Sequence, residues 1–338
     1  MSLRILIAGG YGLIGSNIAR HLRKINKEVE IILAGRSPEK GEALARELGG
    51  TRTVYLDINN IDQTLSDVGK IDLIVAALQD PADTLIHAAI ERNIAHIGIT
   101  KLAGDIGPIT FAAMQSPPKR PIVLLGHSDG GVNTIVAQKA AEEFQSIHSI
   151  EVAALYDPLD PIGPMNASDF DNNAGLSDRV LLRNAGIWAW VDASANIRKV
   201  RIANDFLEGY PVPLLDVPSL AGITRASRVR WDYVNGESMG TRAGIKASHD
   251  VYIDIEGVMN TGSTATRRIV VSDPNGQAHL TGLGVLVAIE RILGLDGQSA
   301  VDGGVFLPET LVSPDAAIRR FKGFGVSIQQ FDSTKQNF

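Results

Sequence analysis

The sequence predicts an α/β protein in which a doubly wound parallel sheet is joined to a second, α+β domain with a mostly antiparallel sheet. In the first 130 residues, short apolar runs alternate with helical patterns, as they do where strands are joined by crossover helices. The run Leu73–Leu78 is apolar throughout, which is typical of a parallel strand buried on both faces. After about residue 147, apolar residues alternate along longer stretches, which favours antiparallel strands.

The first domain is expected to contain six strands joined by helices. Residues 13–24 have apolar side chains at helical spacing, and a further helix is expected over about 81–92. Between them, Ser37 and Pro38 favour a helix start, and Gly49-Gly50 favours its end. The expected strands are 3–8, 29–34, 53–56, 73–78, 94–99 and 122–125.

The second domain is expected to open with a helix over 132–144 and a strand over 150–156. The acidic, proline-containing stretch 157–178 predicts a loop. Further strands are expected over 197–202, 223–234, 243–258 and 265–272, followed by a helix over about 279–293. This division gives domains over 1–130 and 131–303, with a C-terminal segment, 304–338, that we expect to pack back on the first domain.

Composition excludes several classes of function. The 338 residues include no cysteine, which rules out disulfides, a thiolate zinc site and a catalytic thiol. Histidine and acidic residues show no metal-ligand spacing, so we expect no metal. The net charge of −6, without a basic patch, predicts no nucleic-acid partner. Apolar runs fall far short of the roughly 18 residues of a membrane span. With no secretory signal pattern either, we expect a cytoplasmic protein that binds no membrane.

A glycine-rich turn lies between the first expected strand and the first expected helix. Its sequence is Gly9-Gly10-Tyr11-Gly12-Leu13-Ile14-Gly15, with Gly-x-Gly-x-x-Gly at 10, 12 and 15. One such glycine makes a tight turn, one lets the backbone approach a pyrophosphate, and one lets the helix pack against the strand. The helix N-terminus then offers N–H groups to the phosphates. We expect this segment to bind a dinucleotide; the alternative is a turn with purely structural glycines.

The end of the second strand, Ala34-Gly35-Arg36-Ser37, indicates which dinucleotide binds. Arg36 lies 21 residues after Gly15, where an acidic residue would hold the ribose 2′-hydroxyl of NAD. A guanidinium can instead bind the 2′-phosphate of NADP, and Ser37 adds a hydroxyl at a helix start. We therefore expect NADP as the cofactor; the alternative is a solvated arginine. Asp57, after the third strand, either accepts a hydrogen bond from the adenine amine or caps the following helix.

Several segments resemble the saccharopine dehydrogenase family. The glycine turn, Ala34–Ser37 and Glu91–Thr100 resemble its NADP-binding domain, and Leu125–Val132 resembles the turn after that domain's sixth strand. Gly304–Glu309 resembles the family's C-terminal Gly-Val-x-x-Pro-Glu. The resemblance covers 1–135 well and 279–312 loosely. It implies a Rossmann domain, a second domain with an antiparallel sheet, a site in the cleft between them, and a homodimer.

The chain departs from this family near the nicotinamide end of the expected cofactor. Family members often have a Gly-Pro pair after the fourth strand, whereas this chain has Ala77-Leu78-Gln79-Asp80-Pro81. We include Ala77 among the cofactor-binding residues. The fifth strand reads His96-Ile97-Gly98 where Tyr-x-Asp is common. The resemblance implies a small polar substrate, such as an amino-acid-derived imine, without identifying it.

Residues that follow the strands are candidates for catalysis, because doubly wound sheets bind ligands beyond the carboxyl ends of their strands. Lys101, after the fifth strand, could act as a general acid or hold a carboxylate; otherwise it is solvated. His127, after the sixth, is expected to titrate near neutrality and exchange a proton; otherwise it is a hydrogen-bonded loop residue. Asp129 is either catalytic or the N-cap of the next helix.

In the second domain, Arg228 and Arg230 are candidates for substrate binding. If the segment is a strand, both side chains lie on one face, where paired guanidiniums could hold an anionic substrate. The alternative is a solvated face.

These features together predict an NADP-dependent oxidoreductase that transfers a hydride to or from a small molecule. One alternative is a non-catalytic sensor that binds NADPH. Another is an extended short-chain dehydrogenase or epimerase, because Gly9, Gly12 and Gly15 also form Gly-x-x-Gly-x-x-Gly. That chemistry needs a tyrosine four residues before a lysine, and none of the six tyrosines has one.

Overall fold

The structure is a computed structural model that describes residues 2–162, 178–203 and 205–332. Contacts divide the chain into two compact units. Unit 1 comprises Met1–Gly126 and Thr281–Val312, and unit 2 comprises His127–Leu280 and Ser313–Phe338. In this grouping Thr281–Val312 joins unit 1, although most of unit 2 precedes it in the sequence. The contiguous boundaries given above stay predictions.

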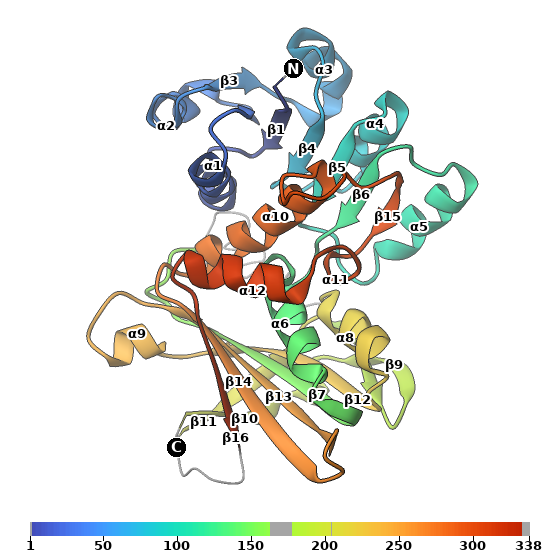
Figure 1. Ribbon diagram of the computed structural model, residues 1–338, viewed down its shortest axis with the longest axis vertical. Coiled ribbons are helices and arrows are strands. Elements are labelled where there is room, and N and C mark those ends of the chain that lie inside the picture. Colours follow the sequence, from blue (N-terminus) through green and yellow to red (C-terminus); the bar gives the residue numbers. More distant parts are fainter. Residues whose placement is uncertain (1, 163–177, 204, 333–338) are drawn as a thin grey trace. The chain divides into compact units, whose positions relative to one another are not determined.

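Unit 1 is built around a sheet of seven parallel strands in the order β15-β6-β5-β4-β1-β2-β3 (Figure 1). The strands are β1 (Arg4–Ala8), β2 (Glu30–Gly35), β3 (Thr51–Tyr55), β4 (Leu73–Ala76), β5 (Ala95–Gly98), β6 (Pro121–Leu124) and β15 (Gly304–Phe306). The parallel doubly wound sheet is thus confirmed, with six strands close to their expected positions. The seventh, β15, pairs in parallel with β6 at one edge.

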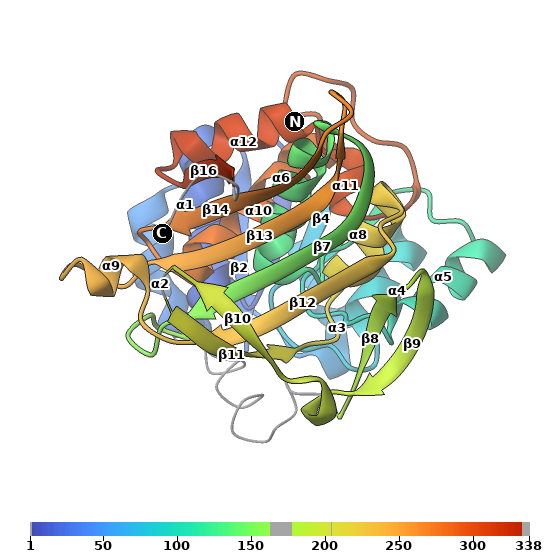
Figure 2. The ribbon, with the colours of Figure 1, turned by 90° about the horizontal axis from the view of Figure 1, so that it is seen from below.

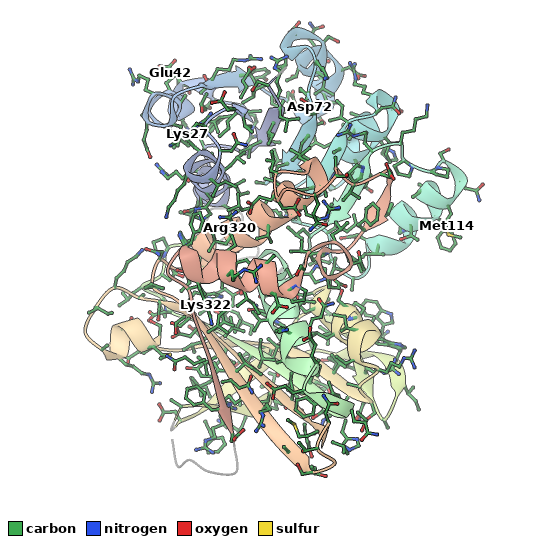
Figure 3. All side chains as sticks on the ribbon, viewed as in Figure 1. Lys27, Glu42, Asp72, Met114, Arg320 and Lys322 are labelled. Carbon is green, nitrogen blue, oxygen red and sulfur yellow. The ribbon has the colours of Figure 1, made fainter. Side chains whose placement is uncertain are left out.

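Apolar side chains on both faces of this sheet explain its burial. Ile5–Ala8 of β1 and Leu73–Val75 of β4 are 0% exposed, as expected for strands enclosed between helices. The helices of unit 1 are α1 (Leu13–Ile25), α2 (Glu42–Leu48), α3 (Ile61–Val68), α4 (Thr84–Arg92), α5 (Ile106–Gln115), α11 (Pro308–Leu311) and most of α10 (Gln277–Leu293), with 3-10 turns η1 (Pro38–Gly41) and η2 (Ile58–Asn60). On α5, Met114 points away from the sheet and is 71% exposed (Figure 3).

Unit 2 contains a second sheet, whose described strands run in the order β10-β11-β12-β7-β13-β14-β16 (Figure 2). A hairpin of β8 and β9 joins it through β12. The strands are β7 (Phe144–Tyr156), β8 (Arg179–Asn184), β9 (Ile187–Asp192), β10 (Arg198–Ile202), β11 (Asp205–Pro211), β12 (Arg228–Asn235), β13 (His249–Met259), β14 (Thr264–Asp273) and β16 (Ser327–Asp332). Among these pairs only β12 and β7 run parallel, so the mostly antiparallel sheet is confirmed.

Helices of unit 2 cover one face of this sheet. α6 (Val132–Ala141) packs on β13 and β14, and α8 (Asp216–Thr224) packs on β7 and β12. α12 (Pro314–Gly323) packs in turn on α6, and both are drawn on the same side of the sheet in Figure 2. A short helix, α9 (Met239–Arg242), precedes β13.

Local signals explain where unit 2 differs from the expected elements. The expected strand 223–234 is wrong at its start, because Asp216–Thr224 is helical and β12 begins at Arg228. Pro218 and Gly222 usually argue against a helix, but Pro218 lies in the first turn, where its missing N–H costs little. The expected helix 132–144 ends at Ala141, and β7 begins at Phe144.

Residues 163–177, which make up most of the loop expected over 157–178, lie outside the described residues. None of the described helices has both the length and the apolar character that crossing a bilayer requires.

Candidate functional site

The glycine turn of unit 1 leaves no room for side chains. A Cβ on Gly9 would lie 2.4 Å from the Ala77 carbonyl oxygen, and one on Gly10 would lie 2.7 Å from that of Ile7. A Cβ on Gly15 would lie 2.2 Å from the Gly9 oxygen. Gly9 also has φ +78°, a conformation that favours glycine. These glycines bring the end of β1 against the start of α1 and against Ala77 after β4.

The N-terminus of α1 has the features that a phosphate group requires. Its N-cap, Gly12, is exposed and has no side chain to occupy the first N–H groups. The first turn contains no acidic residue, and the helix runs for 13 residues. Uncapped N–H groups and the positive end of a helix dipole together attract phosphate. The turn therefore fits the pyrophosphate of a dinucleotide.

The loop after β2 carries the residues expected to distinguish NADP from NAD. Arg36 is exposed and makes no hydrogen bond or ion pair with any described residue, so its guanidinium is available to a ligand. The backbone N–H of Ser37 donates to Tyr11 Oη at 2.8 Å. The helix expected between Ser37 and Gly49 is present as the turn η1, which has Ser37 as its N-cap, followed directly by α2, which has Gly49 as its C-cap.

Asp57 caps the turn after β3. Its side chain accepts hydrogen bonds from the Asn59 backbone N–H and Nδ2, both at 3.0 Å. This cap is the alternative offered for Asp57 in the sequence, and the contact with adenine stays a prediction. Asp57 also lines a cavity of about 380 Å³ with residues of β3, η2 and α3, among them Arg52, Tyr55 and Gln63.

Lys101 is buried inside unit 1. It is 7% exposed, its Nζ donates to the Asp80 carbonyl oxygen at 2.8 Å, and it pairs with Asp83. The alternative of a solvated lysine is therefore wrong. Nearby, burial and then the Lys101 charge lower the pKa of His96 to about 3. Neither ring nitrogen of His96 has a hydrogen-bond partner among the described residues.

His127 belongs to unit 2 and is buried there. Its Nε2 lies 2.8 Å from Ser219 Oγ, which matches the alternative of a hydrogen-bonded loop histidine. Burial lowers the pKa of His127 to about 3, because the charged ring would lose its hydration. The expectation that His127 titrates near neutrality is therefore wrong.

Asp129 is a buried carboxylate and not a helix cap. It has φ +51°, and the N-cap of α6 is Gly131, so the capping alternative is wrong. Asp129 Oδ2 accepts from Asn133 Nδ2 at 2.8 Å and lies 3.1 Å from His249 Nε2. Burial alone would raise the pKa of Asp129, but the charge of His249 and these hydrogen bonds bring it below its usual value.

His249, at the start of β13, is a candidate that the sequence pattern did not single out. It is 1% exposed, and its ring meets that of Tyr156 edge-on at 5.1 Å. Burial acts to lower the pKa of His249, but Asp129 more than offsets this and raises it above its usual value. His249 can therefore hold a proton near neutral pH. It lies 120 positions from Asp129 in the sequence, so no local signal connects them.

A second carboxylate supports the same turn. Asp216, at the start of α8, is 0% exposed and accepts from the Ser128 N–H at 2.7 Å and from Thr134 Oγ1 at 3.1 Å. Burial raises the pKa of Asp216 to about 7, and the neighbouring Asp129 acts in the same direction. We call Ser128, Asp129, Asn133, Asp216 and His249 the Asp129 cluster.

The two arginines expected to bind substrate are engaged in ion pairs. Arg230 holds the fully buried Asp232, with Nε 2.8 Å from Oδ1. Arg228 lies 3.2 Å from Glu151, and its side chain is 52% exposed. Both are on β12 with period-two spacing, as expected. Arg228 thus stays open to solvent, whereas Arg230 is committed to Asp232. Among the described residues, no group of three or more His, Asp or Glu could hold a metal ion.

A comparison with known protein families covers the part of the chain that contains the glycine turn. Residues 5–102 match the family described as Saccharopine dehydrogenase NADP binding domain. The matched residues include the glycine turn, Arg36, Asp57 and Lys101. No curated protein matches the sequence significantly.

Solved structures share the fold over nearly the whole chain. The apo L-glutamate-forming saccharopine dehydrogenase of Saccharomyces cerevisiae covers 98% of this chain and 100% of its own, with a TM-score of 0.70 and 13% identity. An oxidoreductase from Agrobacterium radiobacter, solved with NAD⁺, L-tartaric acid and magnesium, covers 98% of both chains, with a TM-score of 0.51 and 14% identity. Residues 5–102 therefore match the nucleotide-binding domain of saccharopine dehydrogenases, and the chain as a whole has the fold of the yeast protein.

Proposed function

We propose that this protein is an NADP-dependent oxidoreductase that transfers a hydride to or from a small polar substrate, such as an amino-acid-derived imine. The observation that carries the proposal is the match of residues 5–102 to an NADP-binding domain, at a glycine turn whose helix N-terminus is uncapped. Bound nicotinamide would supply or accept the hydride. The chain would bind the cofactor, orient the substrate and move a proton.

Arg36 supports NADP over NAD. An exposed guanidinium with no partner among the described residues is suited to a phosphate, which it can bind through two parallel hydrogen bonds. NAD has no phosphate at the ribose 2′-position. A carboxylate that would repel the 2′-phosphate is absent from the Ala34–Ser37 ending.

We assign the proton transfer to Asp129 and His249. His249 holds its proton near neutral pH because Asp129 lies 3.1 Å away. His249 would donate this proton when the substrate is reduced and take it back in the reverse reaction. Lys101 and His127 are weaker candidates. Lys101 is held by Asp83 and by the Asp80 carbonyl, and burial keeps His127 neutral.

Cofactor titration tests this proposal first. NADPH fluorescence should change on addition of the protein, with a dissociation constant well below that of NADH. NADPH should then be oxidised when amine and keto-acid pairs, which form imines, are supplied. No binding of either dinucleotide would overturn the proposal, whereas tight NADH and poor NADPH binding would overturn only the assignment to NADP.

A second candidate function is a non-catalytic NADPH sensor. The observation that favours it is the burial of Lys101, His127 and Asp129, each of them already bonded within its own unit. A sensor would bind NADPH without oxidising it in any substrate screen, and would bind a partner protein only with NADPH present. The homodimer implied by the family resemblance is part of either proposal, and sedimentation equilibrium would test it.

A further inference from the structure

The side chain of Tyr11 packs against two glycines. A Cβ on Gly35 would lie 2.3 Å from Tyr11 Oη and 2.6 Å from its Cζ. A Cβ on Gly41 would lie 2.9 Å from Tyr11 Cδ1. Any larger residue at either position would therefore displace the ring. Gly35 ends β2 and Gly41 ends η1, so the Tyr11 ring lies against both ends of the loop that carries Arg36 and Ser37.

The phenol of Tyr11 has a hydrogen-bond donor to spare. Its oxygen accepts the Ser37 backbone N–H at 2.8 Å, and this is its one hydrogen bond to the described residues. A phenol oxygen that accepts a hydrogen bond can still donate its own proton. Tyr11 is partly exposed, and its Oη lies at the Ser37 N–H, next to the residue expected to bind the 2′-phosphate. The side chain that contacts the Ser37 N–H thus comes from the glycine turn and not from the loop itself.

We propose that Tyr11 is a specificity-determining residue for NADP, donating its phenol proton to the 2′-phosphate that Arg36 binds. This rests on the proposed function, since it requires a dinucleotide on the glycine turn. The Ser37 N–H polarises the phenol, which strengthens it as a donor to an anion. The same contact holds the backbone of the loop at Ser37, so the backbone next to Arg36 is ordered before the cofactor binds. NADH presents a 2′-hydroxyl there, which needs no charged partner.

The Tyr11→Phe variant tests the proposal because it removes one oxygen and keeps the ring packed against the two glycines. Losing a hydrogen bond to a charged group should raise the NADPH dissociation constant about tenfold or more. The NADH dissociation constant should stay within about twofold of wild type. Tyr210→Phe is the matched control, because Tyr210 lies on β11 in unit 2 and bonds to Glu208.

Competitors that carry only part of the cofactor show which group of the cofactor Tyr11 contacts. Adenosine 2′,5′-bisphosphate should lose affinity for Tyr11→Phe by the same factor as NADPH, whereas ADP should bind the variant and the wild type alike. Arg36→Ala should lower NADPH affinity and leave NADH binding intact, which locates the 2′-phosphate independently. Thermal unfolding of each variant verifies that the fold is retained.

Three outcomes would be decisive. Equal losses of NADPH and NADH affinity in Tyr11→Phe would show that Tyr11 only supports the turn, and would overturn the inference. Unchanged NADPH affinity in that variant would also overturn it, while leaving the proposed function in place. If wild-type protein bound neither dinucleotide, the proposed function itself would fail.

Discussion

Asp129 Oδ2 and His249 Nε2 lie 3.1 Å apart, and neither residue is more than 2% exposed. Asp129 stands in a turn where it, Gly130 and Gly131 all have positive φ. This backbone turns the carboxylate toward the first residue of β13. The pair is thus an ionised contact inside unit 2, held by a strained turn on one side and by a central strand on the other.

Removing either partner of this pair should leave the other as an unpaired buried charge. We expect Asp129→Asn and His249→Gln each to lower the free energy of unfolding by about 3 kcal/mol at pH 7. The double variant should lose less than the sum of the two, by about 1–3 kcal/mol, because its second change removes a charge that the first left unpaired. Urea unfolding of the four proteins measures this coupling. Strictly additive losses would show that the two groups do not interact.

The same pair predicts the direction of a pH effect. The folded-state pKa of His249 is raised, so its protonation stabilises the fold fully below the unfolded value of about 6.5. That contribution is lost as the pH rises through the folded pKa. The free energy of unfolding of the wild type should therefore fall on the alkaline side relative to that of His249→Gln.

The sequence predicted the parts of the fold whose signals are local. A continuous apolar run marked β4, and the glycines of the first turn predicted a dinucleotide site within the region that matches an NADP-binding domain. The β8–β9 hairpin escaped because its two-residue turn is Ala185-Gly186, both with positive φ, where asparagine or aspartate usually precedes the glycine. Local signals also pointed to Asp129 but gave it the wrong alternative role.

The rest of the candidate site depends on contacts between distant residues. Asp216 bonds to Ser128 from 88 positions away, and His249 meets Asp129 from 120 positions away. A histidine or aspartate in a strand or helix pattern carries no mark of such a partner. Burial, which sets the pKa of His127 and of Asp216, is likewise a property of the packed chain and not of the neighbouring sequence.

Replacing His96 should remove part of the sensitivity of the fold to acid. Burial holds its folded-state pKa at about 3, so the unfolded chain takes up a proton near pH 6.5 and the folded chain does not. Stability from this residue is therefore present above pH 6.5 and falls as the pH drops toward 3. Between pH 7 and pH 5 it should decrease by about 2 kcal/mol in the wild type.

In His96→Leu this decrease should be absent, because leucine does not titrate. Urea midpoints at pH 7 and pH 5 measure the difference. His87→Leu is the control, since His87 is exposed on α4 and should leave the acid loss of the wild type intact. An acid loss in His96→Leu as large as that of the wild type would contradict the assignment.

Asp157 should stabilise unit 2 only when ionised. Burial acts to raise its pKa, but hydrogen bonds from Thr241, from the Ser238 N–H at 2.8 Å and from the Leu159 N–H at 2.9 Å lower it to about 2. Its contribution is complete above the unfolded pKa of about 4 and is lost as the pH falls toward 2.

We expect Asp157→Asn to cost about 2 kcal/mol at pH 7 and close to nothing at pH 2. Thermal unfolding across this range measures the loss. The exposed Asp302, which has no described hydrogen bond or ion pair, provides the control Asp302→Asn, for which we expect no change. A cost that stayed constant down to pH 2 would mean that shape rather than charge matters at residue 157.

Gly126 sets how closely the end of β6 approaches the loop after β5. A Cβ on this residue would lie 1.4 Å from the Lys101 carbonyl oxygen and 2.6 Å from its carbonyl carbon, so backbone would have to move. Its φ is not positive, and the constraint is therefore one of space. Gly126→Ala should cost at least about 3 kcal/mol of stability and displace Lys101 from Asp83. Gly107→Ala, on α5, where the added Cβ would meet no atom within 4 Å apart from its chain neighbours and the backbone of its own helix, should cost nothing. Urea unfolding compares the two, and equal stability of both variants would show that the strand end and the loop separate at little cost.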